Sequence, residues 1–87
     1  MLSLRHADSA SLKRLEPMLA QLRAMPELKE VRPGVFYRRS RAFMHFHDDP
    51  SGLHTDIRLG DSFERHRVET ADEQAHLIED IRRALGP

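Results

Sequence analysis

The segment AFMHFHDDPSGLHTDIRL, residues 42–59, decides the fold because it holds two alternating runs separated by a turn signal. Residues 42–47 and residues 53–59 each alternate apolar and polar side chains, which is the pattern of a half-buried β-strand. The intervening DDPSG, residues 48–52, is polar and contains proline and glycine, as hairpin loops do. The sequence therefore predicts an antiparallel β-hairpin in the middle of the chain.

The same alternation predicts how the two strands pair. Side chains alternate across a strand, so a register that keeps the apolar residues together also gathers the polar ones on the opposite face. A slip of one residue would bury histidine and aspartate among apolar side chains, which disfavours every neighbouring register. The predicted pairs on the polar face are His47 with His54, His45 with Asp56, and Phe43 with Arg58.

Helices are expected on both sides of this hairpin. Residues 9–25 carry leucine and methionine at offsets of three, four and seven, which is one helical face, but Pro17 leaves two alternatives open. Either the helix begins near Glu16, or it starts earlier and is kinked there, with Asp8, Ser9 or Ser11 as its cap. The last helix is predicted from the capping box Thr70-Ala71-Asp72-Glu73, the apolar stripe that follows it, and the terminating Gly86-Pro87.

The remaining segments complete an α+β prediction. Residues 27–34 read as a connection that ends in a Pro33-Gly34 turn, residues 35–38 and 63–68 as strands, and Arg39-Ser40 as a reversal. We therefore expect a single two-layer domain over residues 1–87, with residues 1–8 as a frayed tail. Its antiparallel meander of three or four strands would have the N-terminal and C-terminal helices on one face.

Composition narrows the class of protein. The 87 residues include 14 Lys+Arg and 14 Asp+Glu, so the formal net charge is zero, and there is no cysteine. That length excludes a multidomain enzyme or a (β/α)₈ barrel, and the missing cysteines exclude a disulfide framework. No run of residues suits a signal peptide or a membrane helix, so a cytoplasmic protein is expected.

The polar face of the hairpin is the one constellation that could carry chemistry. Imidazole and carboxylate together bind Zn²⁺, Ni²⁺ or Fe²⁺, and a His-x-His pair on a strand points two ligands the same way. His45 beside Asp56 could instead act as an oriented base, and a plain polar or partner-covered face is the third interpretation. Asp48 and Asp49 lie at the rim of this face. The predicted metal ligands are His45, His47, His54 and Asp56, and a small ligand could also contact Phe43 and Arg58.

Arg38, Arg39 and Arg41 form the single basic cluster, next to Tyr37. Arginine beside an aromatic ring suits phosphate contact and base stacking, which makes a nucleic-acid accessory protein one alternative. Zero net charge weakens that alternative, because no excess of basic residues is present to release counterions. A charged turn between two strands is the simpler interpretation.

Over about residues 18–59 the chain resembles the small bacterial luciferase-domain proteins. Those proteins share a proline-and-aromatic entry, a histidine-rich strand, a glycine and a short aspartate-containing strand. The resemblance implies an α+β architecture and draws attention to His45 and His47, and it implies no established activity. The family's tryptophan-containing strand has no counterpart in this sequence. The matching residues are Pro33, Arg41, Ala42, Phe43, His45, His47, Gly52, Asp56 and Ile57.

These observations favour a non-catalytic binding module that uses the polar His/Asp face of the hairpin, either for a small ligand or for a partner. Phe43 on that face suggests that something covers it, and a second copy of the chain is the partner expected first. The alternatives are a metal-binding or metal-dependent hydrolytic protein that uses the His-x-His hairpin, and the nucleic-acid accessory that uses the arginine cluster.

Overall fold

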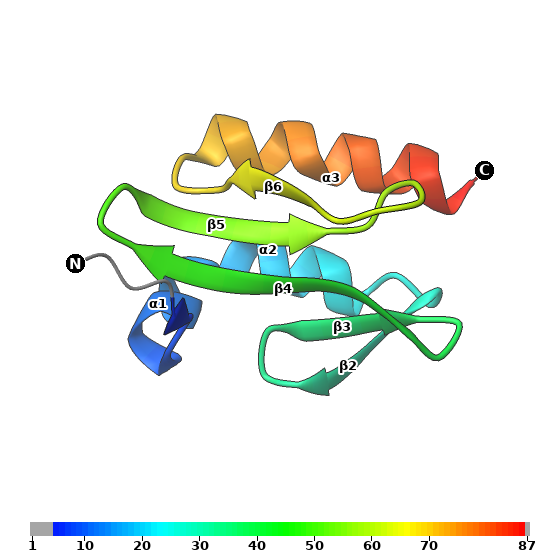
Figure 1. The fold of residues 1–87 in the computed structure, drawn as a ribbon, viewed down its shortest axis with the longest axis horizontal. Coiled ribbons are helices and arrows are strands. Elements are labelled where there is room, and N and C mark those ends of the chain that lie inside the picture. The colour runs from blue at the N-terminus through cyan, green and yellow to red at the C-terminus, as the bar shows by residue number, and fades with distance from the viewer. Residues whose placement is uncertain (1–4, 87) are drawn as a thin grey trace.

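The chain folds as an antiparallel sheet with helices on one of its faces, in a computed structural model that describes residues 5–86 (Figure 1). The five strands of the meander follow one another in the order β2-β3-β4-β5-β6, and the two-residue strand β1 pairs with β4 beside β3. In chain order the elements are β1 (Arg5–His6), α1 (Ser9–Arg14), α2 (Glu16–Arg23), β2 (Leu28–Arg32), β3 (Val35–Arg38), β4 (Arg41–Asp49), β5 (Gly52–Ile57), β6 (Glu64–Arg67) and α3 (Ala71–Leu85).

The central hairpin has the register that the alternation predicts. Strands β4 and β5 pair with His47 opposite His54 and with His45 opposite Asp56. The backbone amide of Arg58 donates to the carbonyl oxygen of Phe43 at 2.8 Å, which continues the same register beyond the end of β5. The α+β class, the antiparallel sheet and the flanking helices are therefore confirmed.

The proline at position 17 divides the N-terminal helical segment in two. Helix α1 begins after Asp8, whose side chain accepts a hydrogen bond from the Ser11 amide, and ends at Arg14. Helix α2 starts at Glu16, so Pro17 lies in its first turn, where a missing amide hydrogen costs little. Leu15 separates the two helices and is fully buried.

Helix α3 begins as its sequence predicts. The Thr70 side chain accepts a hydrogen bond from the Glu73 amide at 3.1 Å, and the Glu73 carboxylate accepts one from the Thr70 amide at 2.9 Å. This reciprocal pair satisfies two amide groups that the first helical turn leaves without a partner in the helix. The apolar stripe of α3 then buries Leu77, Ile78 and Ile81.

Two details of the prediction are wrong. Residues 28–32 form β2, whereas the sequence was expected to hold only a connection there, so the meander has five strands instead of three or four. Strand β2 is at the edge of the sheet and only Leu28 in it is buried, so its side chains show little alternation. It is held by pairing with β3 across the Pro33-Gly34 turn, in which Gly34 has a positive φ of 76°.

The second correction concerns the expected tail at residues 1–8. Residues 1–4 lie outside the described residues, but β1 pairs with residues 47 and 48 of β4 and residue 8 caps α1. The amide of Ala7 also donates to the carbonyl oxygen of Phe46 at 3.1 Å. Residues 5–8 therefore belong to the folded domain.

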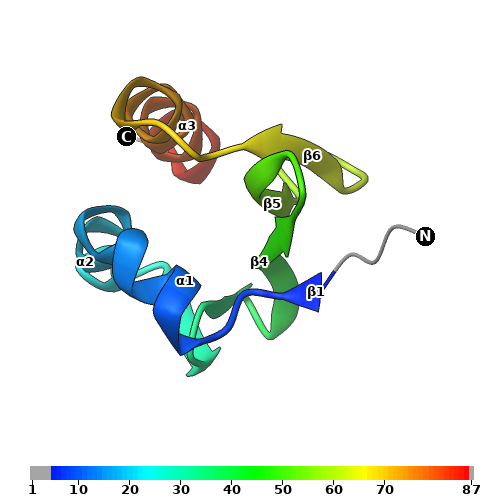
Figure 2. The same cartoon turned by 90° about the vertical axis from the view of Figure 1, so that its left-hand side faces the viewer.

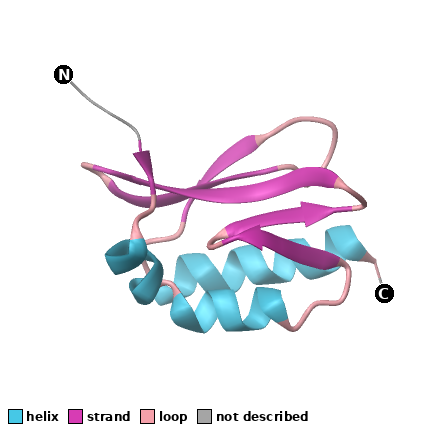
Figure 3. Ribbon diagram, turned by 90° about the horizontal axis from the view of Figure 1, so that it is seen from below, coloured by secondary structure: helices cyan, strands magenta, loops and turns pink. Residues whose placement is uncertain are grey.

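The core lies between the sheet and the helices, which all cover the same face (Figures 2 and 3). Strands β4 and β5 contribute Met44, Phe46 and Ile57, each at most 1% exposed. The opposite face of these two strands is free of helices and carries the histidines. Helices α2 and α3 meet the strand residues with Met18, Leu19, Leu22, Leu77, Ile78 and Ile81.

Candidate functional site

Three of the predicted metal ligands converge on the outer face of the sheet. His45 and His47 on β4 and Asp56 on β5 each offer one ligand atom, and these atoms all lie within 4.8 Å of one another. The two imidazole rings are 4.7 Å apart between centroids and almost perpendicular, at 80°. Two imidazoles and one carboxylate are donors that transition-metal ions accept in proteins.

The Asp56 carboxylate is the electrostatic centre of this group. His47 Nε2 lies 2.9 Å from Asp56 Oδ2, and Arg65 donates from Nε to Oδ1 at 2.8 Å and from Nη2 to Oδ2 at 3.0 Å. The hydrogen bonds from Arg65 are the largest influence on the pKa of Asp56. Together with His47 they outweigh the effect of burial and lower that pKa from 3.8 to about 2. Asp56 is therefore a carboxylate anion at all physiological pH values.

Strand pairing holds the three groups in place. Thr55, which is fully buried on the core side of β5, donates its hydroxyl hydrogen to the carbonyl oxygen of His45 at 2.8 Å. Phe46, between the two histidines, is 1% exposed and directed into the core. Because neighbouring residues of a strand point to opposite faces, burial of Phe46 directs both imidazoles outward.

His54 does not join this group of ligand atoms, although it is the register partner of His47. Its Nδ1 lies 3.1 Å from the carbonyl oxygen of Gly52 and 3.6 Å from Asp49 Oδ2, so the ring turns toward the hairpin loop. Asp49 also accepts hydrogen bonds from the amide and hydroxyl of Ser51, at 2.8 and 2.7 Å. The predicted rim residue Asp48 accepts a 2.6 Å hydrogen bond from the Ser11 hydroxyl. The predicted set of four ligands is therefore reduced to three.

Phe43 is not on the exposed polar face, which corrects the prediction. It is 3% exposed and belongs to the hydrophobic core. The reason is a β-bulge: Phe36 pairs with Met44 and Tyr37 with Ala42, so β4 has one extra residue opposite β3. With Phe43 buried by its own chain, the sequence argument for a covering partner no longer applies.

Arg58 is not among the converging ligand atoms, and the Phe63 ring lies next to both Arg58 and His45. The Nε and Nη2 of Arg58 donate to the carbonyl oxygen of Ala42 at 3.3 and 2.7 Å, and its guanidinium lies 4.5 Å from the centroid of the Phe63 ring. Together with Phe43 it lines a hollow that also includes the predicted basic residues Arg38, Arg39 and Arg41.

Sequence reasoning did not single out Arg65 or Phe63. Arg65 is the register partner of Asp56 across β5 and β6, and the Phe63 ring lies 6.0 Å from that of His45. The four residues of β6 are all polar, so their pattern indicates neither a buried face nor a register. The Gly60-Asp61 turn signal in the connection does not fix the register either, because six residues separate the two strands. The one sequence signal for the Arg65–Asp56 contact was the charge of Asp56, which favours a basic residue opposite it on the next strand.

Comparisons with family models, with curated proteins and with solved structures found no match to this chain. The resemblance to luciferase-domain proteins therefore stays a prediction from the sequence. None of the helices within residues 5–86 combines the length and apolar character needed to cross a membrane.

The low pKa of Asp56 predicts a pH-dependent contribution to stability. The pKa is depressed on folding, so the contribution is complete above about pH 5 and is lost as the pH falls through 3.8 toward 2. Asp56→Asn is expected to lower the free energy of unfolding by about 1–2 kcal/mol at pH 7, allowing for solvent screening at the half-exposed Arg65. Urea unfolding at pH 7, 5 and about 2.5 measures this difference and its loss in acid.

Asp61→Asn is the matched control, because Asp61 is an exposed loop carboxylate. It is expected to change the free energy of unfolding by less than about 0.5 kcal/mol at every pH. A difference between wild type and Asp56→Asn that stays constant from pH 7 to about 2.5 would contradict the electrostatic explanation.

Proposed function

We propose that this domain is a non-catalytic binding module whose outer sheet face holds a divalent transition-metal ion at His45, His47 and Asp56. The observation that carries the proposal is the convergence of three ligand atoms within 4.8 Å on two paired central strands. Zn²⁺ is the ion that two imidazoles and one carboxylate suit best, with Ni²⁺ next among the ions such donors accept.

The spacing of the ligand atoms is close to what a metal ion requires. Ligand atoms about 2.0–2.1 Å from a tetrahedral Zn²⁺ are about 3.4 Å from one another. Groups that already lie within 4.8 Å need only small side-chain rotations to reach that spacing. Because β4 and β5 fix the three Cα positions, most of the conformational entropy of these three residues is lost on folding and does not have to be lost again when the ion binds.

Arg65 would serve as an outer partner of the metal site. The Asp56 Oδ2 atom that would coordinate the ion is the one that His47 and Arg65 Nη2 contact. The hydrogen bond from Arg65 Nε to Oδ1, at 2.8 Å, can persist while Oδ2 binds the ion. Such outer-shell hydrogen bonds orient carboxylate ligands in metal sites.

The same geometry favours binding over catalysis. A general base works best when its pKa lies near the working pH. Asp56, with a pKa of about 2 and a bidentate arginine partner, is a weak base and a permanently charged ligand. Three protein ligands leave a coordination position for water or for a group from another molecule. We propose that this position is where a small ligand or a partner reaches the site.

The test is metal binding by untagged protein stripped with a chelator. Isothermal titration with Zn²⁺, Ni²⁺ and Mn²⁺ is expected to show one ion bound per chain. Zn²⁺ and Ni²⁺ should bind more tightly than Mn²⁺, because Mn²⁺ prefers oxygen ligands to imidazole. Imidazole ¹⁵N resonances of His45 and His47 should shift on Zn²⁺ addition, while those of His54 stay in place. No heat with any ion, or equal shifts at all three histidines, would overturn the proposal.

The homodimer expected from the sequence also stays a proposal. Light scattering of the stripped protein with and without one equivalent of Zn²⁺ tests it and separates two cases. A mass that doubles only with Zn²⁺ would mean that a partner copy contributes to the coordination sphere. A strict monomer under both conditions would contradict the dimer and leave the metal site unaffected.

A further inference from the structure

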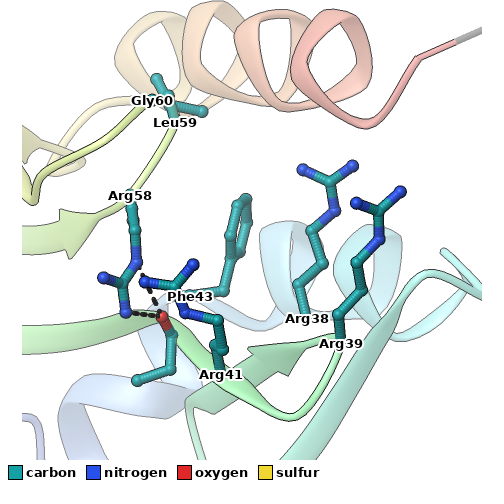
Figure 4. Close-up of a pocket in the computed structure, with 8 residues that line it drawn as sticks. Arg38, Arg39, Arg41, Phe43, Arg58, Leu59 and Gly60 are labelled. Carbon is teal, nitrogen blue, oxygen red and sulfur yellow. Dashed lines mark hydrogen bonds between the residues drawn. The ribbon is translucent and has the colours of Figure 1, made fainter.

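A hollow that the proposed metal site does not use lies where the β3–β4 turn approaches the segment after β5. Its volume is about 130 Å³ (Figure 4). Half of the residues around it are arginines, and none is acidic. The lining residues are Arg38, Arg39, Arg41, Ala42, Phe43, Arg58, Leu59 and Gly60.

The arginines of this hollow are not neutralised by the chain. Within residues 5–86, no salt bridge involves Arg38, Arg39, Arg41 or Arg58. Since acidic and basic residues are equal in number, this is a local excess of positive charge in a neutral protein. The arginines elsewhere that do pair with carboxylates are Arg14, Arg23, Arg65, Arg67 and Arg83.

The β3–β4 turn has a backbone conformation that is unfavourable for the two residues that form it. Arg39 and Ser40 have positive φ angles of 54° and 65°, in a two-residue hairpin turn where asparagine and glycine are the favoured residues. In the view of Figure 4 the side chains of Arg38 and Arg39 extend in the same direction.

Arg58 forms a fixed wall of the hollow. Its two hydrogen bonds to the Ala42 carbonyl oxygen and its contact with the Phe63 ring hold the guanidinium in one orientation. The Phe43 ring, which is 3% exposed, is an apolar part of the lining. An apolar group beside a guanidinium held in one orientation lowers the local dielectric constant, which strengthens the attraction of that guanidinium for an anion.

We infer that this hollow binds the phosphoryl group of a small phosphomonoester. Guanidinium groups from the β3–β4 turn, from the start of β4 and from the segment after β5 all line the hollow. The three terminal oxygens of a phosphoryl group can accept hydrogen bonds from more than one of them, whereas one carboxylate is satisfied by a single guanidinium. The volume of about 130 Å³ suits one phosphoryl group, so the rest of the ligand would extend toward solvent. A nucleic-acid backbone would need several phosphate contacts along a basic track.

The test uses the whole chain in chelator, so that no metal is needed and failure of the metal site leaves the result unaffected. Thermal unfolding is measured with inorganic phosphate or glycerol 3-phosphate against chloride at the same ionic strength. Both phosphates are expected to raise the unfolding midpoint as their concentration rises, the monoester at lower concentration. An Arg38→Gln/Arg39→Gln variant and an Arg58→Gln variant should each require at least about tenfold more phosphate for the same shift.

Two controls make the test decisive. Arg83→Gln on α3 removes one positive charge from a remote surface, as Arg58→Gln does from the hollow, and should leave the phosphate effect unchanged. Arg39→Lys keeps the charge but loses the planar fork, so it should restore only part of the effect. No stabilisation beyond chloride, or an equal loss in Arg83→Gln, would overturn the inference. A single-stranded oligonucleotide that binds more tightly than the monoester, with a steep salt dependence, would overturn it in favour of nucleic acid.

Discussion

His47→Ala is expected to weaken Zn²⁺ binding by at least about 100-fold, because even changes to the outer partners of metal ligands cost 10–100-fold. His47 has a double role: its imidazole is one of the converging ligands, and its Nε2 lies 2.9 Å from Asp56 Oδ2. Its loss therefore removes a donor and also frees the carboxylate to rotate toward Arg65. Competition of Zn²⁺ against a chromophoric chelator measures the affinity over this range.

His54→Ala is the matched control for this prediction. His54 lies opposite His47 in the hairpin and is the same kind of residue, but its ring turns toward Gly52 and Asp49. Its removal should change Zn²⁺ affinity by less than about threefold if ligation alone decides the affinity. Equal losses for the two variants would mean that histidines bind the ion non-specifically, and the proposed site would be wrong.

His47→Gln separates ligation from structure. His47 is 8% exposed, so its replacement by alanine could loosen the hairpin as well as remove a ligand. Glutamine can donate a hydrogen bond to Asp56 but is a poor ligand for Zn²⁺. The expected result is near wild-type stability in chelator with the full loss of Zn²⁺ affinity. Retention of affinity in His47→Gln would show that His47 acts only by positioning Asp56.

The central hairpin could be predicted because its two faces differ so strongly. A one-residue slip would bury His45 and Asp56 in place of Phe46 and Thr55, and no turn chemistry could offset that cost. The α3 capping box was predictable for a similar reason, since Thr70 and Glu73 satisfy each other within four residues. Both features depend on local sequence alone.

Features that depend on a neighbouring strand could not be predicted. The bulge that buries Phe43 exists only relative to β3, and the chain around Phe43 carries no glycine that would signal it. Strand β2 shows no alternation because only one of its residues is buried. Its Glu30 carboxylate accepts a 2.7 Å hydrogen bond from Arg23 Nε of α2, a contact that depends on the tertiary fold. The contact of Arg65 with Asp56 likewise needs the register of β6. The convergence of His45, His47 and Asp56 on one face was therefore predictable, whereas the orientation of His54 and the contact with Arg65 were not.

Phe46→Ala is expected to have the largest effect on stability, a loss of about 3–5 kcal/mol in the free energy of unfolding. Phe46 is 1% exposed in the strand that carries both imidazoles, and its carbonyl oxygen accepts the Ala7 amide. Its ring also lies near Gly34, where a Cβ atom would be 3.6 Å from Phe46 Cδ2. Because a domain of this length has a total stability of about 4–13 kcal/mol, the variant should be only marginally folded.

The same substitution links the core to the proposed metal site. Phe46 fixes the outward direction of His45 and His47, so the cavity left by alanine should let both imidazoles move and weaken Zn²⁺ binding together with stability. Phe46→Leu keeps most of the buried volume and should therefore retain the Zn²⁺ affinity. Val31→Ala is the control for stability: Val31 is 39% exposed, so its loss should change the free energy of unfolding by less than about 0.5 kcal/mol. Zn²⁺ at one fixed concentration, about 100 times the wild-type Kd, should add about 2.7 kcal/mol to the free energy of unfolding of the wild type and clearly less to that of Phe46→Ala. Urea unfolding with and without Zn²⁺ measures both quantities. Wild-type affinity in folded Phe46→Ala would show that strand pairing alone, without the buried ring, orients the two histidines.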